Sequence, residues 1–272
     1  MTITALLNRG LVAALAAMIT VAVSAQAPAP APAQQKPFEP SVGQAGKDVV
    51  WVPTADVLVA KMLDMAKLTP QDYLIDLGSG DGRTVIAAAK RGATAMGIEY
   101  NPDMVELSKK NAAAAGVAGK ATFVKADIFE SDYSKATVLT LFLLPQLNLK
   151  LRPTILDMKP GTRVVSNSFN MEDWEPDDTA RVETECTSWC TAYLWIVPAK
   201  VDGTWTSPNG NLTLKQNFQM VTGTLGSNAI SNGRLRGTEL TFTAGNTKYV
   251  GQVNGNTIKG TAGSAAWSAT KK

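Results

Sequence analysis

Residues 73–102 read YLIDLGSGDGRTVIAAAKRGATAMGIEYNP and decide the fold of the domain that contains them. The run 73–77 is short and apolar, as in a buried strand, and the RTVIAAAKR that follows has the periodicity of an amphipathic helix. A second strand at 94–99 leads to Asn101-Pro102, which fit the cap and first turn of another helix. This alternation predicts a parallel sheet with helices on both faces.

The loop after the first strand, DLGSGDG, carries glycine at three alternate positions, Gly78, Gly80 and Gly82. Because glycine has no Cβ, such a loop turns sharply and lets backbone amides approach a ligand closely. A dinucleotide site has the spacing G-x-G-x-x-G, with pyrophosphate at the amino end of the helix. Here the spacing is G-x-G-x-G and Asp76 precedes it, which suits a cationic ligand better than pyrophosphate.

Two more acids end later strands. Glu99 lies about where a ribose-binding carboxylate is expected and can accept hydrogen bonds from both sugar hydroxyls. Asp127, at the end of ATFVKAD, is placed to meet the exocyclic amine of adenine. The alternatives are an ordinary tight turn for the glycines, a helix cap for Glu99 and a surface turn for Asp127. Together the strand ends describe a nucleoside that carries an amino acid and no phosphate.

From about Val49 to Val197 the chain resembles a class I S-adenosylmethionine-dependent methyltransferase. The resemblance implies an α/β fold with a Rossmann-like, doubly wound, mostly parallel sheet that ends in an antiparallel hairpin. It also implies S-adenosyl-L-methionine as cofactor, with Asp76 near its amino group, Glu99 on the ribose and Asp127 near adenine. The cofactor-binding residues implied in this way are Asp76, Gly78, Ser79, Gly80, Asp81, Gly82, Glu99 and Asp127.

A closer resemblance is to the protein-lysine methyltransferases that modify the rotor ring of ATP synthase or adenine-nucleotide carriers in mitochondria. The matching segments are VPT at 52–54, DLGSGDGR, GIEYNP, LLPQLNLKLRPTIL, GTRVVSNSF and W-x-P-D at Trp174 to Asp177. It implies a protein lysine as methyl acceptor. Since the unperturbed pKa of lysine is about 10.4, an apolar slot that lowers this pKa would favour the reactive neutral amine. The candidates to line that slot are Trp51, Leu144, Pro145 and Gln146.

The composition excludes several other kinds of chemistry. The chain has no histidine, which removes Ser-His-Asp and Cys-His catalysis and most transition-metal sites, so we expect no metal. The net charge of +3 and the absence of a long basic run argue against a nucleic-acid partner. Cys186 and Cys190 are either a short disulfide across a hairpin tip or two unpaired thiols on adjacent strands. Methyltransferases of bases and amides carry Asp or Asn with two prolines at the positions that Leu143 to Gln146 occupy here. This difference argues against a base or a glutamine amide as methyl acceptor.

Four segments are expected along the chain. Residues 1–25 have a cation, an apolar run and a small-residue cleavage pattern, which predict a signal peptide. Residues 26–46 form an Ala/Pro-rich linker. Residues 47–200 form the methyltransferase domain, closed by a hairpin near 182–198. Residues 201–272 form a small β domain, a meander of repeated hairpins with Asn-Gly turns that is either a barrel or a sandwich.

The leading hypothesis is therefore an exported or membrane-tethered methyltransferase of protein lysine. We expect it in the periplasm or secreted, or else anchored by an uncleaved leader, with no other membrane-spanning segment. A small-molecule methyltransferase with the same cofactor site is one alternative. Another is a non-catalytic envelope binding module, in which the β domain contacts an envelope component. Export leaves the supply of cofactor unexplained, because S-adenosylmethionine is made in the cytoplasm.

Overall fold

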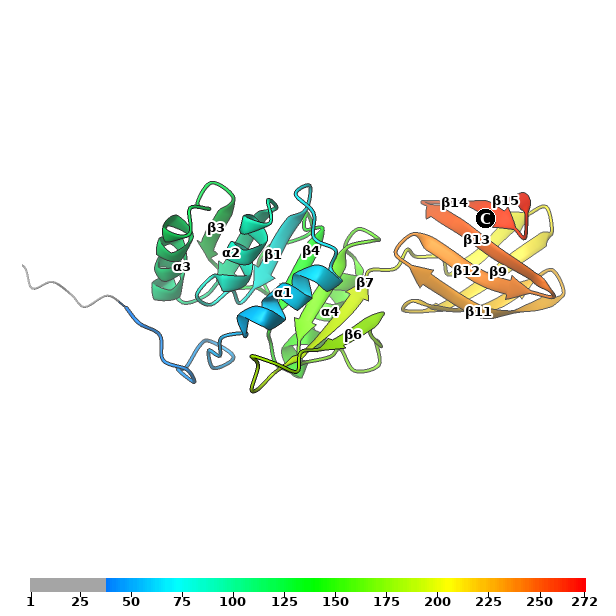
Figure 1. Cartoon of the computed structure of the whole chain (residues 1–272). Coiled ribbons are helices and arrows are strands. Elements are labelled where there is room, and N and C mark those ends of the chain that lie inside the picture. The colour runs from blue at the N-terminus through cyan, green and yellow to red at the C-terminus, as the bar shows by residue number, and fades with distance from the viewer. Residues whose placement is uncertain (1–37) are drawn as a thin grey trace, which may run out of the picture. The chain divides into compact units, whose positions relative to one another are not determined.

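The computed structural model describes residues 38–272, in which an α/β domain precedes an all-β domain (Figure 1). The predicted signal peptide and the linker up to residue 37 lie outside the described residues. Within 38–272, no helix has the length and apolar character needed to cross a bilayer.

The α/β domain is built on a seven-stranded sheet with the order β3-β2-β1-β4-β5-β7-β6. Its strands are β1 (Tyr73–Leu77), β2 (Thr94–Glu99), β3 (Ala121–Lys125), β4 (Val138–Leu141), β5 (Arg163–Asn167), β6 (Asp178–Arg181) and β7 (Thr191–Ile196). The first five strands in this order are parallel, whereas β7 pairs antiparallel with both β5 and β6. The doubly wound sheet with an antiparallel end is confirmed. Its order reverses between β1 and β4, where such sheets open a crevice for ligands.

Helices cover this sheet, and alternate residues of the central strand β1 reach both of its faces. The helices are α1 (Asp56–Met65), α2 (Arg83–Lys90), α3 (Pro102–Ala114) and α4 (Pro145–Leu156). Leu74 packs in the apolar cluster with α1 and α2, whereas Ile75 packs in the cluster with α4. Successive strand residues point to opposite faces, so one short apolar strand holds two cores together. The expected cap of α3 is present, since Asn101 Oδ1 accepts the Asp103 N–H at 2.9 Å.

The all-β domain is a closed antiparallel barrel, which decides between the two architectures left open by the sequence. Its strands are β8 (Gly203–Ser207), β9 (Gly210–Asn217), β10 (Met220–Leu225), β11 (Asn228–Arg236), β12 (Glu239–Ala244), β13 (Thr247–Asn254), β14 (Thr257–Ala262) and β15 (Ala265–Lys271). Pairing of β15 with β8 closes the barrel. Large rings fill its interior, including Trp205, Phe242, Tyr249 and Trp267.

The turn between β9 and β10 contacts the α/β domain at the W-x-P-D segment. The Phe218 ring stacks on the Trp174 indole with ring centroids 5.9 Å apart. Gln219 Nε2 donates a hydrogen bond to the Glu175 carbonyl at 2.7 Å. On β11, Arg234 forms an ion pair of 2.7 Å with the fully buried Asp177 carboxylate. This segment, which the sequence resemblance singled out, is thus where the two domains meet.

Candidate active site

A pocket opens at the carboxyl ends of the five parallel strands. Each strand contributes at least one lining residue at or just beyond its end, among them Gly78 from β1, Glu99 from β2, Asp127 from β3, Phe142 from β4 and Phe169 from β5. Carboxyl ends of parallel strands share one edge of the sheet, so residues far apart in sequence meet there. The sheet order makes this a row, with Asp127 toward one end and Phe169 toward the other.

The glycine loop between β1 and α2 has a left-handed backbone at all three of its glycines. The φ angles of Gly78, Gly80 and Gly82 are 76°, 54° and 83°. Gly80 is also crowded, since a Cβ there would lie 2.6 Å from Trp51 Nε1. Its N–H donates to Glu99 Oε2 at 2.9 Å, which ties the loop to the next strand. These positions therefore require glycine for both conformation and space.

Asp76 is a buried carboxylate without an ion-pair partner. Its side chain accepts a hydrogen bond from Thr140 Oγ1 at 2.6 Å, and no Lys or Arg within residues 38–272 forms an ion pair with it. Burial raises the Asp76 pKa to about 7, an effect that Thr140 opposes and the charge of Glu99 reinforces. An ammonium group at this point would stabilise the ionised form. In the same loop, the buried Ser79 Oγ has no hydrogen-bond partner among the described residues.

Glu99 is fixed by backbone donors on both of its oxygens. Oε2 accepts from Gly80, and Oε1 accepts from the Asn101 N–H at 2.9 Å. A carboxylate has about four lone-pair positions, so two remain for further hydrogen bonds. Glu99 lines the pocket, where those positions suit the two hydroxyls of a ribose.

Asp127 is engaged by a segment that precedes the sheet. Residues 43–51, here called the strap, fold back on themselves through hydrogen bonds between Gly43 N–H and the Trp51 carbonyl and between Trp51 N–H and the Gln44 carbonyl. From the strap, Lys47 forms an ion pair with Asp127 Oδ2 and lies 5.1 Å from the centre of the Tyr100 ring. The hydrogen bond from Lys47 lowers the Asp127 pKa, so this carboxylate stays ionised.

The strap lines the pocket from Gln44 to Trp51, although part of it falls within the segment expected to be a linker. Its residues show no helix or strand period, so no local pattern indicates that it packs on the site. The long-range pair between Lys47 and Asp127 is what reveals its position.

The fourth acid, Asp81, serves the loop itself. Its carboxylate holds Arg83 in an ion pair of 2.7 Å, and Arg83 also donates to the Thr54 carbonyl at 2.8 Å. Thr54 belongs to the VPT segment, which is thereby joined to the start of α2. Asp81 lines the pocket, but its charge is already matched.

The four candidates for the acceptor slot separate into two groups. Trp51 and Leu144 line the pocket. Pro145 and Gln146 form the first turn of α4 outside the lining, and Gln146 is exposed. The structure therefore brings the strap tryptophan and the end of β4 together, while the next two positions of the chain turn away.

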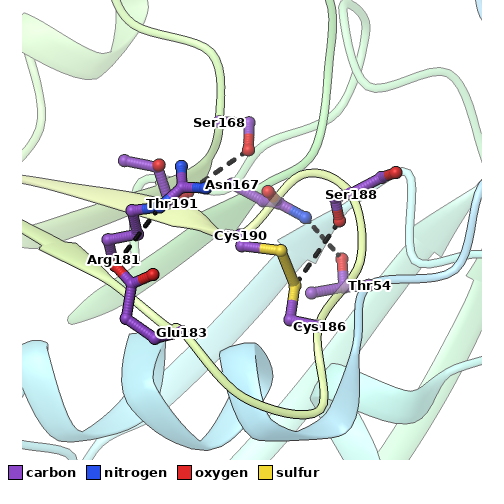
Figure 2. The surroundings of a disulfide bond; sticks show 9 residues. All are labelled: Thr54, Asn167, Ser168, Arg181, Glu183, Cys186, Ser188, Cys190 and Thr191. Atoms are coloured by element: carbon purple, nitrogen blue, oxygen red, sulfur yellow. Dashed lines mark hydrogen bonds and ion pairs between the residues drawn. A yellow bond between two sulfur atoms is a disulfide. The ribbon is translucent and has the colours of Figure 1, made fainter.

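Three aromatic pocket residues were not singled out by the sequence. Phe142, Phe169 and Trp189 line the pocket, and the Phe169 ring lies 6.0 Å from that of Phe142 and 5.2 Å from that of Trp189. Trp189 lies between Cys186 and Cys190, which form a disulfide (Figure 2). A large aromatic residue between two cysteines is the signal that could have revealed the third ring.

The groups along this row fit the parts of S-adenosylmethionine. Asp76 suits the amino group, the glycine loop lets the backbone approach the methionine part, and Glu99 suits the ribose. Asp127 suits adenine, and its carboxylate would then contact both Lys47 and the adenine amine. The domain is thus a class I S-adenosylmethionine-dependent methyltransferase, and the bound cofactor supplies an electrophilic methyl group on a positively charged sulfur.

Known proteins place the chain more closely. The model of the ANTKMT methyltransferase domain family matches residues 76–178. A protein-lysine N-methyltransferase of Saccharolobus islandicus is 41% identical over 152 residues, which cover 55% of this chain and 94% of that protein. A lysine N-methyltransferase of Mus musculus, named for its action on an ATP synthase component, is 40% identical over 39% of this chain and 43% of its own length. The chain belongs to the same methyltransferase family as the Saccharolobus protein.

A solved structure agrees with this fold and cofactor. A protein described as an RNA methyltransferase from Salinibacter ruber, crystallised with S-adenosyl-L-homocysteine, has 47% sequence identity and a TM-score of 0.52. The match covers 55% of this chain and 96% of that protein. The names of these relatives thus include two classes of methyl acceptor, protein lysine and RNA.

Proposed function

We propose that this methyltransferase modifies the ε-amine of lysine in a protein substrate. The observation that carries the proposal is the character of the pocket beyond the glycine loop. The lining residues contributed there by the β4 end, α4, the β5 end and the loop before β7 are all apolar, namely Leu141, Phe142, Leu143, Leu144, Leu147, Phe169 and Trp189. The names of the relatives from Saccharolobus and mouse support the same acceptor.

An apolar lining suits a lysine amine because only the neutral amine has a lone pair to attack the methyl carbon. As the new N–C bond forms and the S–C bond breaks, the positive charge passes to nitrogen, which later loses a proton to water. Desolvation among leucine and phenylalanine side chains lowers the pKa of an amine and raises its neutral fraction. The absence of a carboxylate among those seven side chains removes the partner that would hold the amine protonated. Positioning then supplies much of the catalysis.

The cations of the pocket argue against an RNA acceptor. Nucleic-acid sites use Lys and Arg to neutralise phosphates. The two cations that line this pocket are both matched already, Lys47 by Asp127 and Arg83 by Asp81. A strand of RNA would have to compete with those carboxylates.

The proposal includes export from the cytoplasm, either as a free protein or through an uncleaved leader. The sequence of residues 1–25 supports it, and so does the Cys186–Cys190 disulfide, because disulfides persist mainly in oxidising compartments. Alkylation of thiols in intact cells checks this point. We expect both cysteines to resist alkylation until a reductant is added, and ready alkylation would contradict export.

The acceptor is tested by incubating the purified full chain with methyl-labelled S-adenosylmethionine and three acceptors: envelope proteins, total RNA and an extract of small molecules. We expect label in protein, located on lysine by mass spectrometry. The Glu99→Ala variant should lose transfer because the ribose contact is lost. Glu106→Ala is the matched control, since Glu106 is an exposed acid paired with Lys109 on α3.

The other arms decide against the proposal. Label confined to RNA would assign the acceptor named for the Salinibacter protein. Label confined to small molecules would leave the cofactor site intact and exclude a protein substrate.

A further inference from the structure

Three aromatic rings stand at one end of the row of pocket residues. Phe142 follows β4, Phe169 follows β5 and Trp189 precedes β7. In the sheet order, β4, β5 and β7 lie on one side of β1, whereas β2 and β3, which carry Glu99 and Asp127, lie on the other. The rings therefore flank the glycine loop on the side opposite the ribose and adenine residues.

The loop that presents Trp189 is held in an unusual backbone conformation. Trp189 has a φ of 59° and Glu185 a φ of 57°, in the left-handed region that side-chain-bearing residues rarely adopt. Such a backbone persists only where its surroundings fix it. The Cys186–Cys190 disulfide (Figure 2) closes the loop around Trp189. The Val182 N–H donates to the Cys190 carbonyl at 2.9 Å.

Trp189 is not a core residue, although it is held in place. The residue keeps 47% of its surface exposed, while its ring contacts Phe169 at 5.2 Å and Phe142 at 6.3 Å between centroids. The loop is anchored to the sheet beside it, because the Ser168 N–H donates to the Thr191 carbonyl at 2.7 Å. A tryptophan that is rigidly held, half exposed and directed at a pocket contributes contact area for a ligand at small entropic cost.

We propose that Phe142, Phe169 and the disulfide-held Trp189 form an aromatic wall that binds the side chain of the acceptor lysine. This wall is a substrate-binding site distinct from the cofactor residues, and it rests on the lysine acceptor proposed above. The four methylene groups of lysine pack on apolar ring surfaces. The ring faces attract the positive charge that nitrogen gains as the methyl group is transferred. The wall therefore lowers the KM of a lysine substrate through its contacts with the methylene groups, and it stabilises the charge that develops on nitrogen during transfer and in the methylated product.

The wall is tested with two synthetic peptides, one with a single lysine and one with trimethyl-lysine at the same place. The Trp189→Ala variant should lower kcat/KM for the lysine peptide about tenfold, the size expected for loss of one ring that contacts a cation, with the KM raised because the methylene groups lose a packing surface. It should weaken binding of the trimethyl-lysine peptide, measured by calorimetry without cofactor, by a similar factor. The Kd of S-adenosylmethionine should change less than twofold. Trp189→Phe should restore most of the affinity.

Thr187→Ala is the matched control, because Thr187 is exposed in the same loop and does not line the pocket. It should behave as the unmodified protein does. Unchanged peptide affinity in Trp189→Ala would overturn the wall. A matching loss of S-adenosylmethionine affinity would also overturn it, since Trp189 would then serve the cofactor.

Failure of the wall is distinct from failure of the proposed function. If the unmodified protein transfers no methyl group to lysine but modifies RNA, the lysine acceptor and the wall both fall. If it modifies lysine and Trp189→Ala leaves the KM unchanged, only the wall falls.

The disulfide gives an independent test, since it should act through Trp189. Reduction with dithiothreitol, which opens the Cys186–Cys190 bond to two thiols, should raise the peptide KM several-fold in the unmodified protein. The Cys186→Ser, Cys190→Ser double variant should show the same rise without reductant. In Trp189→Ala, reduction should cause no further change. An equal response to reductant with and without Trp189 would show that the disulfide does not act through this ring.

Discussion

The α/β domain and the barrel deal with the edges of their sheets in opposite ways. The barrel pairs its last strand with its first, so every strand has two neighbours and large side chains fill the interior. The α/β sheet stays open, and a pocket forms where its parallel strands end. Closure leaves no strand edge for association, whereas an open parallel sheet provides a crevice.

Buried polar groups show the same contrast. The buried side-chain atoms without a hydrogen-bond partner among residues 38–272 include five in the α/β domain, on Ser79, Asn148, Arg163, Asn167 and Trp174. The barrel has one, on Trp267. Asp76, which is buried and has no ion-pair partner among the described residues, also belongs to the α/β domain. Unmatched polar groups in a native fold call for an explanation, and a ligand is one. Of these groups, Asp76 and Ser79 line the pocket, so the polar groups that a ligand could satisfy there belong to the open sheet.

The largest effect should come from Gly78→Arg, which changes the pocket of the open α/β sheet. The variant places a side chain at a φ of 76° and beside Leu143 in the pocket. We expect S-adenosylmethionine binding by calorimetry to fall more than a hundredfold. Gly116→Arg is the matched control, because Gly116 has a φ of 71° and nothing within 4 Å of a Cβ. Equal binding by the two variants would contradict the location of the site.

Trp205→Ala tests the stability of the closed barrel. The Trp205 ring is fully buried in the barrel, and its Nε1 donates to the Val201 carbonyl at 2.8 Å. Loss of such a ring should lower the free energy of unfolding by about 3 to 5 kcal/mol, measured with denaturant. Binding of S-adenosylmethionine should change less than twofold. A comparable loss of cofactor affinity would show that the barrel core supports the pocket.

The parts of the site that sequence predicted are those with local signals. The spacing of Gly78, Gly80 and Gly82 indicates a backbone that only glycine adopts easily. Glu99 lies at the expected distance from that loop, at the end of the next strand of the same βαβ unit. The sheet and the start of α3 were predicted for the same reason. The Lys47–Asp127 pair joins residues 80 positions apart, and no local pattern reports it.

The barrel and the aromatic wall show the same limit. Repeated Asn-Gly turns predicted hairpins. Closure of the barrel, however, depends on the pairing of β15 with β8, which lie at the two ends of the domain. Phe142 belongs to the apolar run ATVLTLFLL, and only the strand order of the folded sheet brings it beside Phe169 and Trp189. Local patterns thus indicated the glycine loop and Glu99, whereas only the strand order brings the three rings together.

A smaller effect concerns pH. Burial raises the Asp76 pKa to about 7, and binding an ammonium group should lower it again. The complex then holds fewer protons than the free protein, so affinity for S-adenosylmethionine should rise with pH below about 7 and level off above it. Calorimetry between pH 6 and pH 8 measures the slope, which approaches tenfold per pH unit at its acid limit. Asp76→Asn should bind more weakly and show a flat profile over this range. A flat profile in the unmodified protein would contradict this role of Asp76.

The smallest effect should come from the contact between the two domains. Arg234→Ala removes the partner of the buried Asp177 carboxylate, which keeps its hydrogen bond from the Ile196 N–H at 2.8 Å. Because 41% of the Arg234 side chain is exposed, solvent screens the pair, and the free energy of unfolding should fall by about 1 kcal/mol. Arg236→Ala, an exposed position on the same strand, should change it by less than about 0.5 kcal/mol. If denaturant unfolds the two domains in two steps, Arg234→Ala should lower the midpoint of the first step only. The ion pair stabilises a domain only while the other domain is still folded. An equal change in the midpoints of both steps would show that Arg234 stabilises the barrel itself. The W-x-P-D segment would then not be the contact that couples the α/β domain to the barrel.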